Sequence, residues 1–181
     1  QEGILAHFTA IADATELPVM LYDIPGRSAV PIGVDTLLRA AEHPRIVAVK
    51  DAKADLAAAT AVLRASDLLW YSGDDALNLP FLSIGAVGFV SVAGHLIADR
   101  LRSMLSAFGA GDTRTATTIF YDSEPVAVGL FRAPAVTLTK AALELRGLPA
   151  GPPRLPLLPA DEGQKERLLA DLAAAGMSMV A

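Results

Sequence analysis

Hydrophobic and polar positions follow two different periods along the first part of the chain. Apolar residues between Ile4 and Ala12 recur every three or four positions, a spacing typical of an amphipathic helix. Residues 17–22 then form a continuous apolar run that ends at the turn-forming sequence Asp23-Ile24-Pro25-Gly26. A short run of this kind is typical of a strand buried on both faces, as in a parallel sheet. The pattern therefore predicts a helix followed by a parallel strand.

The same two patterns repeat as far as residue 92. Helices are expected over residues 34–41, 55–63 and 76–84, and strands over residues 46–49, 68–71 and 87–92. Helices that connect successive strands are typical of a parallel α/β assembly.

Beyond residue 97 the periodicity is helical only. Helices are expected over residues 101–108, 113–130, 136–145 and 162–175, with a proline-rich segment at 147–159 that cannot be helical. We therefore expect an α/β region at residues 1–110 and an α-helical domain at residues 111–181.

Four strand–helix units fit either a small open sheet or one half of a (β/α)8 barrel. Neither of the Gly-rich phosphate-binding patterns, G-x-G-x-x-G or G-x-x-x-x-G-K-[ST], occurs in the chain, which weakens the open-sheet interpretation. A barrel places distinctive residues at the carboxyl ends of its strands, and Lys50 directly follows the predicted strand 46–49. The pattern therefore favours the half barrel.

Composition narrows the class of protein. The net charge of −5 makes a nucleic-acid footprint unexpected, and the absence of cysteine excludes disulfides, cysteine nucleophiles and thiolate metal sites. Hydrophobic residues make up 52% of the chain, yet we see no apolar run long enough to span a membrane and no signal peptide. We expect a globular cytoplasmic protein that binds neither nucleic acid nor membrane.

Lys50 is the first candidate for chemistry. At a strand end in the mouth of a barrel its ammonium would be partly desolvated, which favours the neutral amine that can attack a carbonyl. The alternative is a lysine that leaves the sheet and reaches water.

Tyr22 and Arg27 are the next candidates. Tyr22 ends the predicted strand 17–22, so its phenol should lie at the same rim as Lys50, where it could relay a proton. Arg27 follows the Pro25-Gly26 turn, and we expect it on a loop, where its guanidinium could hold a substrate carboxylate. The alternatives are an ordinary packed tyrosine and an ordinary surface arginine.

The sequence Ser72-Gly73-Asp74-Asp75 ends the third predicted strand. Two adjacent carboxylates suggest a divalent metal, but neighbouring side chains diverge, and neither a histidine nor a third acid is near in sequence. We expect no metal site here, but rather a helix N-cap whose backbone amides face the active site.

Two segments together resemble a known family. Residues Leu21-Tyr22-Asp23-Ile24-Pro25-Gly26-Arg27, followed by Val47-Ala48-Val49-Lys50-Asp51-Ala52, resemble dihydrodipicolinate synthase (4-hydroxy-tetrahydrodipicolinate synthase), of the class I pyruvate-dependent aldolases. The segments around Gly73 and Val90 are similar to the family's next two strand regions, and the resemblance continues through the helical tail.

The resemblance implies a fold and a reaction. The fold would be the second half (strands 5–8) of a (β/α)8 TIM barrel with a C-terminal helical domain, usually in a homotetramer or homodimer. Lys50 would form a Schiff base with pyruvate, whose enamine attacks aspartate 4-semialdehyde in lysine (diaminopimelate) biosynthesis. Tyr22 would relay protons, Arg27 would bind the semialdehyde carboxylate, and Gly73 and the backbone of Val90 would border the substrate. The imine on Lys50 would replace any metal or organic cofactor.

Other interpretations stay open. A sister aldolase, such as N-acetylneuraminate lyase or a keto-deoxy-sugar-acid aldolase, shares the lysine and tyrosine but generally lacks Arg27. The family's paired threonines and second tyrosine have no counterpart here, because Thr117-Thr118 lies in the helical tail. We therefore expect the chain to be the C-terminal portion of a larger enzyme, and an inactive fragment that keeps the fold is the third interpretation.

Overall fold

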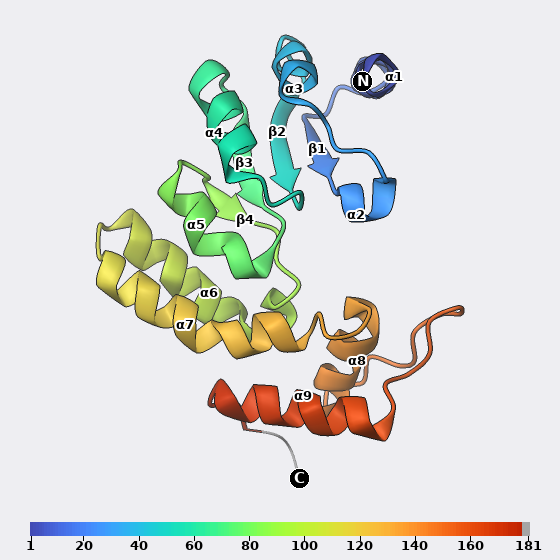
Figure 1. Ribbon diagram of the computed structural model, residues 1–181, viewed down its shortest axis with the longest axis vertical. Helices are drawn as coiled ribbons and strands as arrows, with labels where there is room; N and C mark the ends of the chain where they lie inside the picture. Colours follow the sequence, from blue (N-terminus) through green and yellow to red (C-terminus); the bar gives the residue numbers. More distant parts are fainter. Residues whose placement is uncertain (179–181) are drawn as a thin grey trace. The chain divides into compact units, whose positions relative to one another are not determined.

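The computed structural model describes residues 1–178, and the chain divides into two compact units. The first unit is Gln1–Val90 and contains a parallel sheet with its helices; the second begins at Ser91, and its described part is helical (Figure 1). This confirms the predicted α/β class with a parallel sheet. The predicted domain border after residue 110 stays a prediction. The unit border lies earlier because helix α6 (Gly94–Gly109) packs against helix α7 (Thr113–Gly129).

Helices and strands alternate in the first unit in the predicted order (Figure 1). The elements are α1 (Glu2–Asp13), β1 (Val19–Asp23), α2 (Pro25–Ser28), α3 (Val34–Ala41), β2 (Ile46–Asp51), α4 (Leu56–Ala65), β3 (Leu69–Ser72), the 3-10 helix η1 (Asp75–Leu77), α5 (Asn78–Ser83) and β4 (Gly88–Phe89). The strands lie side by side in the order β1-β2-β3-β4, and every neighbouring pair is parallel. All four strands therefore point their carboxyl ends toward the same edge of the sheet.

The register of the sheet decides which side chains share a face. Val19 pairs with Ile46, but Met20 pairs with Ala48, so the β2 strand carries an extra residue at Val47. A one-residue insertion reverses the alternation of faces along a strand. Because of this bulge, the buried Ile46 faces the same side of the sheet as Val49.

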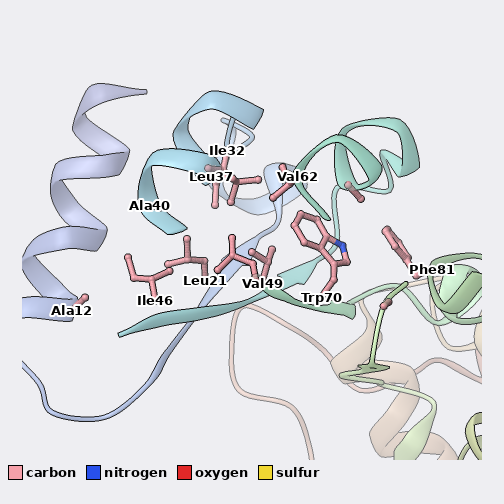
Figure 2. Packing of buried hydrophobic residues seen from close by; sticks show 13 residues of the cluster. Ala12, Leu21, Ile32, Leu37, Ala40, Ile46, Val49, Val62, Trp70 and Phe81 are labelled. Atoms are coloured by element: carbon pink, nitrogen blue, oxygen red, sulfur yellow. The ribbon is translucent and has the colours of Figure 1, made fainter. Parts of the chain in front are cut away.

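The core of the first unit lies between the sheet and its helices. Leu21, Val49 and Trp70 occupy neighbouring register positions on three strands and are almost completely buried. Figure 2 shows them pointing toward the helices, where Leu37, Val62 and Phe81 meet them. Burial of each such side chain contributes about 1.5–3 kcal/mol of hydrophobic stabilisation. The next residue of each strand must therefore face the other way.

Two local predictions from the sequence differ from the structure. The strand expected over residues 87–92 is reduced to β4, although the Val87 and Val90 amides still donate to carbonyls of the neighbouring chain segment, Trp70 and Ser72. The turn expected at Pro25-Gly26 is one turn of helix, so the prediction that Arg27 lies on a loop is wrong. Proline fits the first turn of a helix, and Ala29 ends it with a left-handed φ of 65°.

The described part of the second unit consists of packed helices. Besides α6 and α7 it contains α8 (Ala135–Leu145) and α9 (Glu162–Ala174), close to the predicted ranges. Helix α6 includes a kink at Ile97, and α7 and α9 approach so closely that a Cβ on Gly129 would lie 2.8 Å from the Asp171 carboxylate. None of the helices described in residues 1–178 is long and apolar enough to cross a membrane.

Candidate active site

Four residues form one register row near the carboxyl ends of the strands. Tyr22 pairs with Lys50, Lys50 with Tyr71, and Tyr71 with Gly88. The row directly follows the buried row of Leu21, Val49 and Trp70, so its side chains lie on the face of the sheet opposite to the helices of Figure 2. The structure thus brings Lys50 and Tyr22 together, as the two strand ends predict.

The Lys50 amine lies against the ring of Tyr22. Its Nζ atom is 3.9 Å from the ring centroid, a cation–π distance, and the tyrosine is 45% exposed. An amine that attacks a carbonyl needs a neighbouring group that moves protons, and a phenol can take that role.

Gly73 packs directly against the Lys50 side chain. A Cβ at this position would lie 3.0 Å from both Cγ and Cε of Lys50 and 3.0 Å from the backbone oxygen of Asp51. The Gly73 amide also donates to that oxygen at 2.7 Å, so the two backbones are fixed close together. A side chain at position 73 would therefore press against the lysine stem and the Asp51 backbone.

Val90 ends the first unit beside β3. Its amide donates to the Ser72 carbonyl at 2.8 Å, which places the Val90 backbone next to the residue before Gly73. The Val90 side chain is exposed. The backbone of Val90 therefore lies at the same edge of the sheet as the carboxyl end of β3.

Arg27 is exposed on the short helix α2, four residues after β1 ends. Among residues 1–178 the structure shows no hydrogen bond or ion pair to its guanidinium, which leaves all its donors available to a ligand. The structure places Arg27 on the segment that leaves the Tyr22 strand, but shows no contact with Lys50 itself.

The two adjacent aspartates after Gly73 make local hydrogen bonds. The Asp74 carboxylate accepts a hydrogen bond from the Ala76 amide at 3.0 Å and caps η1, and the buried Asp75 accepts from the Asn78 side chain at 3.1 Å. The predicted N-cap is confirmed at Asp74. In the described part of the chain, residues 1–178, no group of three or more histidine or acidic side chains could hold a metal ion.

The sequence analysis did not identify a buried cluster of charged side chains. This cluster lies next to the row of Tyr22 and Lys50, on the opposite face of the sheet. Asp23 and Asp51 pair in register at the ends of β1 and β2, and the Lys53 Nζ atom lies 3.0 Å from Asp23 Oδ2. Burial raises the pKa of the Asp51 carboxyl, and the nearby charge of Asp23 raises it further, against the lowering effect of backbone amides and Lys53. The sequence does contain one sign of this cluster, because an aspartate directly follows both Tyr22 and Lys50. Successive residues of a strand face opposite sides, so these aspartates lie on the other face of the sheet.

Sequence comparison assigns the chain to a family. The pattern of the dihydrodipicolinate synthetase family matches residues 1–175. The chain belongs to this family. Its curated relatives include 4-hydroxy-tetrahydrodipicolinate synthase 2 of Streptomyces coelicolor, 57% identical over 179 residues, which are 99% of this chain and 60% of that protein. The synthase of Mycolicibacterium gilvum is 55% identical over 98% of this chain and 59% of its own length.

Solved structures of dihydrodipicolinate synthases superpose on the chain. The Bacillus anthracis enzyme gives a TM-score of 0.92 at 44% identity, covering 95% of this chain and 60% of its own. The Cyanidioschyzon merolae enzyme, solved with lysine bound, gives 0.94 at 41% identity, covering 98% and 61%. These synthases are TIM barrels, in agreement with the parallel sheet of the first unit.

The chain spans about 60% of the length of the family members that it matches. Its similarity to each of them covers nearly all of its own residues. Family membership is therefore established for nearly the whole chain.

Proposed function

We propose that the enzyme containing this chain is a 4-hydroxy-tetrahydrodipicolinate synthase, a lyase that condenses pyruvate with aspartate 4-semialdehyde in lysine biosynthesis. The observation that carries this proposal is the Lys50 amine at a strand end, 3.9 Å from the Tyr22 ring. Family membership and relatives named as this synthase support the choice of reaction.

The proposed chemistry begins with attack of the neutral Lys50 amine on the keto carbon of pyruvate. Loss of water gives a protonated imine, whose positive nitrogen accepts the electron pair left when the methyl group loses a proton. The resulting enamine carbon attacks the aldehyde carbon of the second substrate and forms the new carbon–carbon bond. Since the imine is the electron sink, we propose that the reaction uses no metal or organic cofactor.

The other residues have supporting roles in this proposal. The Tyr22 phenol relays protons during addition and dehydration, because the ring that carries it lies against the attacking amine. Arg27 binds the carboxylate of the semialdehyde with its unoccupied donors. Gly73 and the backbone of Val90 border bound pyruvate, since Gly73 packs against the Lys50 side chain and Val90 lies at the same carboxyl edge of the sheet.

We further propose that the four strands are strands 5–8 of a (β/α)8 barrel and that residues 111–181 form the C-terminal helical domain. Two features support the half barrel. The chain covers about 60% of the length of its relatives, and apolar residues such as Met20 and Leu69 are exposed on the sheet face that carries Lys50 and Tyr22. A homotetramer or homodimer stays a prediction, since one solved relative, 26% identical, is described as a monomeric variant. The cytoplasmic location also stays a prediction.

Borohydride trapping tests the proposed function. The complete enzyme is incubated with pyruvate, reduced with borohydride, digested and mapped by peptide mass spectrometry. We expect the reduced pyruvate adduct on the peptide that contains Lys50. An enzyme without this adduct is no Schiff-base aldolase, and an adduct without consumption of aspartate semialdehyde would support a sister aldolase instead.

Replacing Arg27 by alanine should separate the two substrates. We expect kcat/KM for aspartate semialdehyde to fall roughly 10- to 100-fold, because a charge-assisted carboxylate contact of about 1.5–3 kcal/mol is lost. Trapping of pyruvate on Lys50 should stay within about twofold of the wild type, because imine formation does not use Arg27. Steady-state kinetics with each substrate varied in turn measure both effects. Equal losses in both reactions would contradict the role of Arg27.

A further inference from the structure

Residues 24–31, which contain helix α2 with Arg27 and are called the Arg27 loop below, are held at their base by a buried ion pair. Residues 24–31 leave β1 after Asp23, form the one-turn helix α2, and return to the core at Ile32. The Asp23 and Lys53 side chains of the ion pair are only 2% and 12% exposed. Both ends of this segment are attached to the ion pair, because Asp23 directly precedes the segment and Ile32 directly follows it.

Ile32 is held by both members of the pair. Its amide donates to Asp23 Oδ1 at 3.1 Å, and its carbonyl accepts from Lys53 Nζ at 3.1 Å. The Lys53 amine is 3.0 Å from Asp23 Oδ2, so three groups close a ring at the foot of the loop. The side chain of Ile32 is itself part of the hydrophobic core. The foot of the loop is thus fixed, whereas residues 26–31 are exposed.

Lys53 is directed into this ring by its own turn. The Asp51 carboxylate accepts hydrogen bonds from the Lys53 amide at 2.7 Å and the Ala54 amide at 3.1 Å, and Ala54 adopts a left-handed φ of 67°. The Lys53 amine has Asp23 as its ion-pair partner at 3.0 Å, and the backbone of Lys53 is fixed next to the strand that holds Lys50.

We propose that Lys53 is a positioning residue for Arg27: with Asp23 it fixes the foot of the loop and so determines how well the enzyme holds the carboxylate of its second substrate. The inference rests on the proposed function, in which Arg27 binds that carboxylate. Lys53 does not touch the reacting atoms, since its amine lies between Asp23 and the Ile32 carbonyl. Residues 26–31 are exposed, so releasing the end of the segment at Ile32 would let the Arg27 guanidinium change its direction.

Replacing Lys53 by methionine in the complete enzyme tests the proposal. We expect the KM for aspartate semialdehyde to rise roughly tenfold, because small displacements of a substrate-holding group have large effects. Trapping of pyruvate on Lys50 should stay within about twofold of the wild type. Hydrogen exchange in residues 24–32 should become faster. Lys165→Met is the matched control, since it removes a lysine from an exposed ion pair with Glu162 and should change none of these values.

Two further variants separate positioning from general stability. Combining Lys53→Met with Arg27→Ala should be no worse than Arg27→Ala alone, because Lys53 acts through Arg27. Lys53→Arg, which can keep a bond to Asp23, should restore the KM to within about threefold. If Lys53→Met does not fold, Asp23→Asn takes its place, since asparagine can still accept from the Ile32 amide but removes the charged partner of Lys53.

The outcomes distinguish this inference from the proposed function. A wild-type enzyme without a pyruvate adduct on Lys50 overturns both. A wild-type enzyme that forms the adduct, with an unchanged semialdehyde KM in both Lys53→Met and Asp23→Asn, overturns the role of Lys53 alone. Equal losses in trapping and semialdehyde use, or effects that add to those of Arg27→Ala, also overturn it, because they would show a purely structural role.

Discussion

Replacement of Lys50 by arginine is expected to lower the turnover of the complete enzyme by at least about a thousandfold and to abolish trapping of pyruvate. Loss of a covalent nucleophile costs factors of this size or larger. Arginine keeps the positive charge beside the Tyr22 ring, but its guanidinium stays protonated and cannot add to a keto carbon. The variant therefore removes the nucleophile but keeps the positive charge, so the two contributions can be told apart.

The measurements are steady-state turnover and the yield of reduced pyruvate adduct, with circular dichroism and thermal unfolding to show that the variant folds. Lys165→Arg is the matched control, because it makes the same change at the exposed ion pair of α9 and should keep full activity. Turnover of Lys50→Arg within tenfold of the wild type would exclude Lys50 as the nucleophile and, with it, the proposed reaction.

The juxtaposition of Lys50 and Tyr22 was predictable because both residues end short apolar runs. In a parallel sheet such ends meet at one edge, and the register indeed pairs these two residues. The bulge at Val47 was not predictable, because the apolar run 46–49 looks the same with or without it. A bulge exists only relative to a neighbouring strand.

Contacts between distant residues also escaped the sequence analysis. Lys53 and Ile32 are 21 positions apart, and nothing in either segment shows that an amine will meet that carbonyl. The strand at 87–92 was expected to be longer than β4, because apolar residues predict burial, whereas a strand is defined by its hydrogen-bonded partner. In the described residues β4 pairs with β3 alone.

The helix at Pro25–Ser28 shows a different limit. Proline and glycine in succession usually mark a turn, so Arg27 was expected on a loop. The single helical turn forms because proline at its first position loses no hydrogen bond there, and Ala29 can end it in a left-handed conformation. Arg27 therefore lies on a short helix, and the chain returns to the core at Ile32.

Gly73→Ala should be the second most damaging substitution, lowering the rate of imine formation about a hundredfold while the protein still folds. The new Cβ would lie 3.0 Å from the Lys50 stem and from the Asp51 oxygen, closer than side chains normally approach. The backbone cannot move away easily, because the Gly73 amide is bonded to that same oxygen at 2.7 Å. The flexible lysine must therefore shift, and even a small displacement of a nucleophile from its reactive geometry lowers the rate strongly.

The rate of adduct formation in a single turnover with pyruvate measures the effect of Gly73→Ala, and the KM for aspartate semialdehyde should remain unchanged. Gly3→Ala is the matched control, because a Cβ at Gly3 would meet no atom within 4 Å. Imine formation at the wild-type rate in Gly73→Ala would mean that Lys50 reacts from a different side-chain position. The contact between the glycine and the lysine stem would then have no part in the chemistry. A slow rate in Gly73→Ala together with a normal rate in Gly3→Ala would show that the absence of a side chain at Gly73 holds the nucleophile in place.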